Sequence, residues 1–258
     1  MPDLRIGHFC YNYGRIIMNI ENNLLVPFKT LKAAREYVEG FSDPKKMPGW
    51  SYGLPTDMCK TGMILKKIPT SVCSDCYADK GFYTVYPAVK AAQYRRLNSI
   101  DKPRWVEAMI YVMTHAKAIL KDNVFRWHDS GDIQGVEHLD KIVQIAQATP
   151  DVKYWLPTKE SAWIQNYNKP IPKNLVIRLS GSFVDGKAPK YANTSTVVSD
   201  EDDATCNSYL TDKNGEVHTQ KQYNGYTKKQ KQEFDFGHCG ECRQCWDSSV
   251  KNVSYHKH

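Results

Sequence analysis

The chain has 258 residues, of which 41% are hydrophobic and 12% aromatic. These fractions exclude a disordered protein, and the length suits one large domain or two small ones. No apolar run is long enough to cross a bilayer and the first residues lack a signal-peptide core, so we expect a cytoplasmic protein without membrane contact. The net charge of +7 leaves two interpretations open, a solvated basic face or contact with a nucleotide or nucleic acid.

In the first half of the chain, apolar residues recur at helical spacing. Thr30 is a suitable N-cap for a short helix, and longer helices are expected at about 87–98 and 103–120. Residues 43–62 are rich in Pro and Gly and predict an irregular loop.

From residue 123 onward, strands alternate with helices. Short apolar runs predict strands at 123–127, 152–156, 174–179 and 195–199. An amphipathic helix is expected at 136–148, between the first two strands. This alternation predicts an α/β fold of parallel βαβ units, with a partial or full β/α barrel as first choice and an open parallel sheet as second.

The expected organisation has three regions. Residues 1–42 form an N-terminal extension with a short helix, 43–199 a β/α core with a cysteine-bearing loop, and 200–258 a cysteine-rich C-terminal segment. Residues 200–238 are polar with little periodicity, which indicates a surface insertion or a segment organised by metal ligation.

The eight cysteines favour metal binding, because clustered thiols in a reducing compartment are more often ligands than disulfides. Cys239, Cys242 and Cys245 follow the Cys-x2-Cys-x2-Cys spacing with which ferredoxins hold a [4Fe-4S] cluster. Zinc usually takes two Cys-x2-Cys units separated by a longer loop, so zinc stays the alternative. Cys206, the other thiol of the C-terminal half, is the simplest fourth ligand.

A second group of thiols lies earlier in the chain. Cys73 and Cys76 share a tight turn, and Cys59 lies upstream in the Pro/Gly-rich loop. Three thiolates on a cluster would leave one iron open to a substrate or cofactor, as catalytic metal sites do. Two buried structural thiols are the alternative here, and Cys10 is expected to be a bystander.

The motifs "CSDCYADKG", "FRWHDSGDIQGVEHLDKIV" and "YWLPTKE" resemble the bacteriophage gene product 88 family over roughly residues 45–182. A phage origin would place the protein in the host cytoplasm. More distantly, the pattern is similar to radical S-adenosylmethionine enzymes, which are partial β/α barrels with a three-cysteine [4Fe-4S] cluster that binds the cofactor. Their motif is Cys-x3-Cys-x2-Cys with a neighbouring aromatic residue. Cys76 and Tyr77 match its end, whereas Cys59 lies too far upstream, which puts cofactor use in doubt.

The resemblance also implies cofactor-binding residues at the strand ends. Ser130, Gly131 and Asp132 occupy a position comparable to the family's Gly-Gly-Glu turn, where Gly permits close approach and a carboxylate can pair with an ammonium group. Helix capping by Ser130 and Asp132 is an equal alternative. His128 and Asp129 are candidates for proton transfer, against the alternative of a buried, satisfied histidine. Weaker candidates follow the later strands: Lys159, Glu160, Ser180 and Ser182.

The prediction is therefore an iron–sulfur enzyme on a barrel of the radical S-adenosylmethionine type, with one open and one closed [4Fe-4S] site. Its substrate is not named by the sequence, and its partner would be an electron donor such as ferredoxin or flavodoxin. Two other classes stay open. One is a nucleic-acid-binding protein without catalysis, in which zinc or a cluster stabilises the fold and the basic loop 221–231 contacts phosphates. The other is a single-cluster protein for electron or sulfur transfer.

Overall fold

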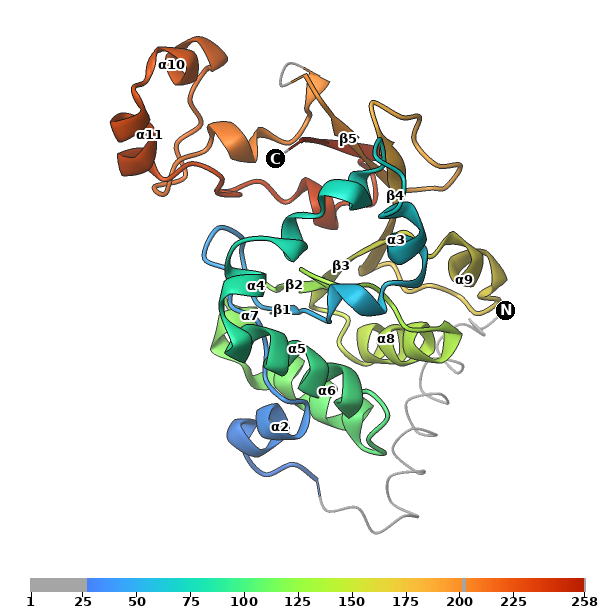
Figure 1. The fold of residues 1–258 in the computed structure, drawn as a ribbon. Helices are drawn as coiled ribbons and strands as arrows, with labels where there is room; N and C mark the ends of the chain where they lie inside the picture. Colours follow the sequence, from blue (N-terminus) through green and yellow to red (C-terminus); the bar gives the residue numbers. More distant parts are fainter. Residues whose placement is uncertain (1–26, 201–202, 258) are drawn as a thin grey trace, which may run out of the picture.

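The computed structural model describes residues 27–200 and 203–257 (Figure 1). Within these residues the chain forms a six-stranded, all-parallel sheet whose strands stand side by side in chain order. The predicted α/β class is confirmed. The strands are β1 (Ser51–Tyr52), β2 (Val124–Trp127), β3 (Lys153–Thr158), β4 (Leu175–Val184), β5 (Thr194–Val198) and β6 (Asn252–His256).

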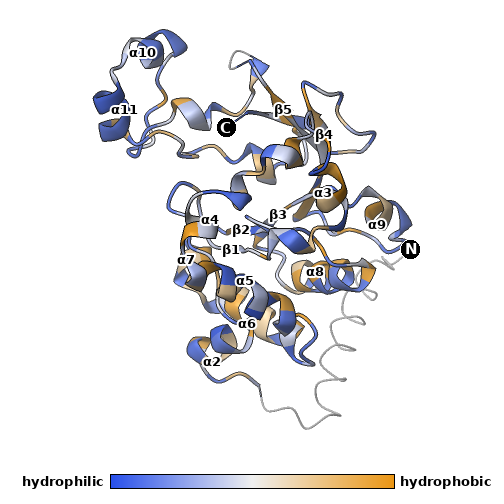
Figure 2. Cartoon of the chain, in the orientation of Figure 1, coloured by the Kyte–Doolittle hydropathy of each residue, from blue (hydrophilic) through white to orange (hydrophobic). Residues whose placement is uncertain are grey.

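Helices from residues 31–148 gather against one side of this sheet (Figure 1). They are α2 (Leu31–Tyr37), α5 (Pro87–Ser99), α6 (Trp105–His115), α7 (Lys117–Leu120) and α8 (Val136–Ala148). Shorter elements lie toward the strand ends and the C-terminal segment: α3 (Lys60–Leu65), α4 (Phe82–Val85), α9 (Ser161–Asn166), α10 (Gln220–Gly225) and α11 (Lys228–Phe234). Figure 2 shows that α10 and α11 are mainly hydrophilic. No helix of the described residues has both the length and the apolar character that crossing a membrane requires.

Alternate residues of the strands point to opposite faces of the sheet, and the two faces have different surroundings. Phe125 and Trp127 of β2 and Tyr154 of β3 pack into the main core with α6 and α8. On the opposite face, Val124 and Trp155 form a small cluster with Trp246 of the short helix η6 (Gln244–Trp246). The helix-covered face is therefore apolar, whereas the other face receives the C-terminal cysteine segment.

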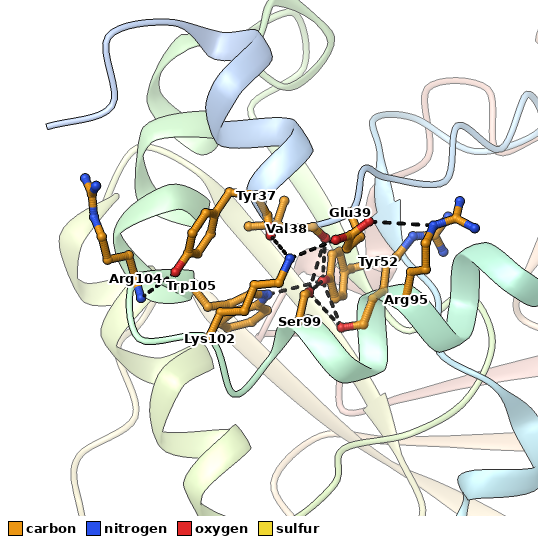
Figure 3. A network of polar contacts seen from close by, with 10 residues as sticks. Tyr37, Val38, Glu39, Tyr52, Arg95, Ser99, Lys102, Arg104 and Trp105 are labelled. Carbon is orange, nitrogen blue, oxygen red and sulfur yellow. Dashed lines mark hydrogen bonds and ion pairs between the residues drawn. The ribbon is translucent and has the colours of Figure 1, made fainter.

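A polar network around Tyr52 joins β1 to the helices inside the main core (Figure 3). The Tyr52 hydroxyl donates to the Val38 carbonyl at 2.7 Å and lies 2.8 Å from the Ser99 hydroxyl. The indole of Trp105 donates to the Tyr52 oxygen at 3.2 Å. Tyr52 is fully buried, and burial raises its pKa to about 12, so it stays a neutral donor and acceptor.

Replacing Tyr52 with phenylalanine is expected to lower the free energy of unfolding by about 1–3 kcal/mol, because the Trp105 donor and the Val38 carbonyl lose a partner in the core. Urea denaturation at neutral pH measures this change. Tyr111 offers a control, since its ring also packs against the core but its hydroxyl makes no hydrogen bond within the described chain. Equal midpoints for Tyr52→Phe and the wild type would contradict a stabilising role for the network.

Several elements differ from the sequence prediction. Residues 43–62 were expected to be irregular, yet they contain β1 and the start of α3. The expected helix 103–120 is divided at Ala116, whose backbone is extended. β4 continues to residue 184, so Ser180 and Ser182 lie within the strand. β6 was not predicted, and it pairs in parallel with β5. The division into three regions stays a prediction.

Candidate functional site: two groups of cysteines

Three cysteines from consecutive short helices come together. Cys59 directly precedes α3, Cys73 lies in η2 (Val72–Asp75), and Cys76 ends η2. The Cys59 thiol interacts electrostatically with both other thiols. A Cβ atom at Gly62 would lie 3.8 Å from the Cys59 sulfur and 3.7 Å from the Cys73 sulfur. The same Cβ would lie 2.9 Å from the Cys59 Cβ, which is too close, so glycine at this position permits the close approach of Cys59.

A buried serine fixes the relation between α3 and η2. The Ser71 hydroxyl donates to the Leu65 carbonyl at 2.6 Å and accepts from the Ser74 backbone N–H at 3.0 Å. Ser71 thus caps the short helix that carries Cys73 and ties it to the helix that follows Cys59.

Side chains after β3 hold this group at the carboxyl ends of the strands. The buried Glu160 carboxylate accepts hydrogen bonds from the Thr61 backbone N–H at 2.8 Å and from the Thr61 hydroxyl at 2.7 Å. This bond fixes the first turn of α3 beside Cys59. The Asp132 carboxylate accepts from the Thr158 hydroxyl at 2.6 Å and from the Lys159 backbone N–H at 2.9 Å, which joins the end of β3 to the loop after β2.

The three thiols lie in surroundings that oppose the thiolate form. Burial raises the pKa of Cys59, Cys73 and Cys76, and neighbouring thiols add to the effect for Cys59 and Cys73. Burial also raises the pKa of Asp132 to about 6 and lowers the pKa of Lys159, whose charge interacts with all three thiols. A bound cation would reverse this balance, because it stabilises the thiolates that burial disfavours.

The remaining four cysteines of the described chain form a second group. Cys239 interacts electrostatically with Cys206 and Cys242, and Cys245 interacts with Cys206 and Cys239. A tight turn links two of them, since the Cys242 backbone N–H donates to the Cys239 carbonyl at 3.0 Å. The Cys206 backbone N–H donates to the Ser254 carbonyl of β6 at 3.0 Å. Long-range folding thus brings Cys206 near Cys239 and Cys245, and its role as a fourth ligand stays a prediction.

Burial dominates the thiols of this group as well. It raises the pKa of Cys239 to about 11 and the pKa of Cys245 to about 12. The Cys245 sulfur lies 3.1 Å from the Tyr255 hydroxyl of β6. All seven described cysteines are free thiols, and no three of their sulfurs lie mutually within 4.8 Å.

His128 and Asp129 follow β2 but face different surroundings. His128 is 2% exposed, its Nδ1 lies 3.1 Å from the Tyr52 carbonyl oxygen, and its ring contacts His138 at 5.4 Å between centroids. Burial lowers its pKa to about 4, so it is neutral near pH 7. The Asp129 carboxylate accepts from the Tyr83 hydroxyl at 3.0 Å, and its backbone carbonyl accepts from the Tyr77 hydroxyl. Their role in proton transfer stays a prediction.

The loop from Ser130 to Asp132 packs tightly on the chain after β1. The Ser130 hydroxyl donates to the Leu54 carbonyl at 2.9 Å and accepts from Gln93 at 2.8 Å. Gly131 has a φ of +76°, and a Cβ there would lie 2.6 Å from the Leu54 Cβ. Contact with Leu54 therefore accounts for the glycine within the chain itself, and cofactor contact by this loop stays a prediction.

Two arginines lie beside the cysteines and were not predicted from the sequence. Arg178 of β4 is fully buried, and its guanidinium donates to the backbone carbonyls of Cys245 at 3.0 Å and Asp247 at 2.8 Å. Arg126 of β2 donates to the Tyr77 hydroxyl at 3.1 Å and interacts with Cys239. Charged residues inside the apolar runs "NVFRW" and "NLVIRL" were the signal that could have revealed them.

Another cluster of potential ligands is accounted for by local hydrogen bonding. The ligand atoms of Asp212, Glu216 and His218 lie mutually within 4.8 Å. Asp212 accepts from the backbone N–H groups of Asn214 at 2.8 Å and Glu216 at 3.0 Å, as an aspartate in a turn does. We assign this cluster to the structure of the turn.

Comparisons with known proteins add one result. No curated protein and no solved structure matches the chain. The family described as gene product 88 matches residues 22–248, which include all seven cysteines of both groups. The chain belongs to the gene product 88 family.

Proposed function

We propose that the protein is an iron–sulfur enzyme with an open three-cysteine site and a closed four-cysteine site. The observation that carries this proposal is the separation of seven free thiols into a group of three from one short stretch of chain and a group of four that folding assembles from Cys206 and the C-terminal thiols. The Cys-x2-Cys-x2-Cys spacing of Cys239, Cys242 and Cys245 suits irons at the corners of a cluster.

The sheet supports a partial β/α barrel as the scaffold. Parallel strands in unbroken chain order, with helices gathered on one side, match the arrangement from which such barrels are built (Figure 1). The three-cysteine group lies beside Asp132, Lys159 and Glu160, which follow β2 and β3. Active sites of barrels lie at these carboxyl ends of the strands.

The open site is where we place the chemistry of a radical S-adenosylmethionine enzyme. When bound, a reduced cluster with one open iron would supply one electron to the sulfonium of S-adenosylmethionine, which breaks a C–S bond and gives methionine and a 5′-deoxyadenosyl radical. Cys59, Cys73 and Cys76 would hold this cluster, and Tyr77, Asp132 and Lys159 are the candidates for contacts with the cofactor. The reaction would draw on an electron donor such as ferredoxin or flavodoxin.

Anaerobic purification tests the proposal directly. The protein is expected to be brown, with about eight irons and eight sulfides per chain for two clusters, or about four of each for one. A colourless protein with stoichiometric zinc would instead support a nucleic-acid-binding protein stapled by metal. Calorimetry with S-adenosylmethionine on the loaded protein then tests the cofactor, and absence of heat and of reductive cleavage would remove that part of the proposal.

Replacing Cys206 with serine is expected to lower the iron content by about half, because the four-cysteine group loses a ligand while the three-cysteine group is unchanged. Iron and sulfide analysis of the anaerobic protein measures the change. Cys10, which lies outside the described residues, provides the matched control, and Cys10→Ser is expected to retain the wild-type content. Unchanged iron in Cys206→Ser would exclude Cys206 as a ligand.

A further inference from the structure

The Arg126 side chain interacts with residues of both cysteine groups. Its guanidinium donates to the hydroxyl of Tyr77, the residue next to Cys76, at 3.1 Å. Its charge also interacts with Cys239 and Cys245 of the other group. The guanidinium carbon lies 4.4 Å from the centre of the Trp155 ring, which supports the cation from one side.

Arg126 and its neighbours in register on two adjacent strands carry buried polar atoms without a hydrogen-bond partner in the described chain. Ser51 of β1 is in register with Arg126, and Arg126 is in register with Trp155 of β3, so the three side chains share one face of the sheet. The Ser51 hydroxyl, the Arg126 Nε and the Trp155 indole nitrogen are each buried without a hydrogen-bond partner in the described chain. Buried polar groups in native proteins are nearly always paired, so three adjacent orphans indicate an absent partner.

Arg178 lies on the same face of the sheet, and its hydrogen bonds provide a comparison for those of Arg126. All three guanidinium nitrogens donate, at 2.7–3.3 Å, to the backbone carbonyls of Thr194, Gln244, Cys245, Asp247 and Val250. Arg126 makes only two such bonds in the described chain, one to Tyr77 and one to the weak thioether acceptor of Met47 at 3.5 Å. Most of the five N–H donors of Arg126 therefore remain available.

The charge of Arg126 also lacks an acidic partner within hydrogen-bond reach. No ion pair within 4.0 Å joins it to a carboxylate of the described residues. Asp129 interacts with it at longer range; one Asp129 oxygen accepts from the Tyr83 hydroxyl at 3.0 Å, and the other is buried without a hydrogen-bond partner in the described chain. A half-buried guanidinium without a carboxylate is costly, and an anionic oxygen ligand is the partner that relieves it.

We propose that Arg126 binds an anionic oxygen group, a carboxylate or a phosphate, of the substrate between the two cysteine groups. The identification of this anion as a substrate rests on the proposed function, whereas the binding of an anion does not. The planar fork of the guanidinium suits bidentate contact with either group, and Ser51 and Trp155 supply further donors on the same face.

Calorimetry on the anaerobically purified protein tests this site with inorganic phosphate and with malonate as separate probes. We expect one saturable site for at least one probe, and the probe that binds more tightly distinguishes a phosphate-bearing from a carboxylate-bearing substrate. Arg126→Met is expected to weaken binding at least tenfold, and Arg126→Lys to give an intermediate loss because lysine keeps the charge without the fork. Circular dichroism confirms that each variant is folded.

Arg35 provides a matched control, because its guanidinium also lies over a tryptophan, 4.5 Å from the Trp50 ring centre, but on the exposed surface. Arg35→Met is expected to bind the probe like the wild type.

Iron analysis of the same samples separates the two proposals. Arg126-dependent binding in iron-free protein would leave the anion site standing and overturn the iron–sulfur function. Iron-loaded protein that binds neither probe, or binds equally in Arg126→Met, would overturn the anion site alone.

Discussion

Replacing Arg178 with methionine is expected to lower the free energy of unfolding by at least about 3 kcal/mol and to abolish metal binding by the four-cysteine group. The side chain is fully buried and donates to backbone carbonyls on both sides of Cys245. Methionine fills much of the volume but donates nothing, so several buried carbonyls lose their partners at once. The turn that presents Cys245 then has no fixed position on the sheet.

Urea denaturation and iron analysis of the anaerobic protein measure these two effects. Arg95→Met serves as the control, since the Arg95 side chain is 57% exposed and its ion pair with Glu39 is 3.6 Å long. The control is expected to change the free energy of unfolding by less than about 1 kcal/mol. Wild-type iron content in Arg178→Met would show that Arg178 does not organise the cysteine segment.

The stability of the protein is expected to fall as the pH drops from about 6.5 to about 4, in part because His128 is buried and neutral. Burial lowers its pKa from 6.5 to about 4, so the unfolded chain takes up a proton at a higher pH than the folded one. The contribution of His128 is therefore fully present above pH 6.5 and is lost as the pH falls, up to about 3 kcal/mol. The pKa of His138, which burial also lowers, acts in the same direction.

Urea midpoints measured at pH 7 and pH 5 test this dependence. His128→Asn is the informative variant, because asparagine does not titrate and tolerates the positive φ of 57° at this position. The variant is expected to lose less stability between these two pH values than the wild type. If both proteins lose the same amount, His128 is not the group that takes up the proton.

Much of the scaffold could be predicted because its elements carry strong periodic patterns. The helix predicted at 136–148 has these bounds in α8, whose apolar residues face the core. β1 could not be found, because it has only two residues inside a Pro- and Gly-rich stretch. The break at Ala116 also escaped, since the apolar spacing continues through it. Such local choices depend on tertiary contacts that no short window contains.

The site was predicted in part for the same reason. Thiol spacing along the chain grouped Cys73 with Cys76 and Cys239 with Cys245, and in the fold these pairs lie near Cys59 and Cys206, whereas their role as ligands stays a prediction. Their supports were harder to find. Glu160 was noted only as a strand-end residue, whereas it fixes the first turn of α3. Contacts of this kind join segments about a hundred residues apart, which spacing alone does not reveal.

The place of β6 in the sheet separates the two cysteine groups in time during synthesis. The Ser254 carbonyl that fixes Cys206 and the Tyr255 hydroxyl beside Cys245 both come from β6. The ribosome must therefore translate residues 252–256 before the four-cysteine group can assemble. Cys59, Cys73, Cys76 and their anchor Glu160 are translated earlier, so the three-cysteine group can form before the four-cysteine group.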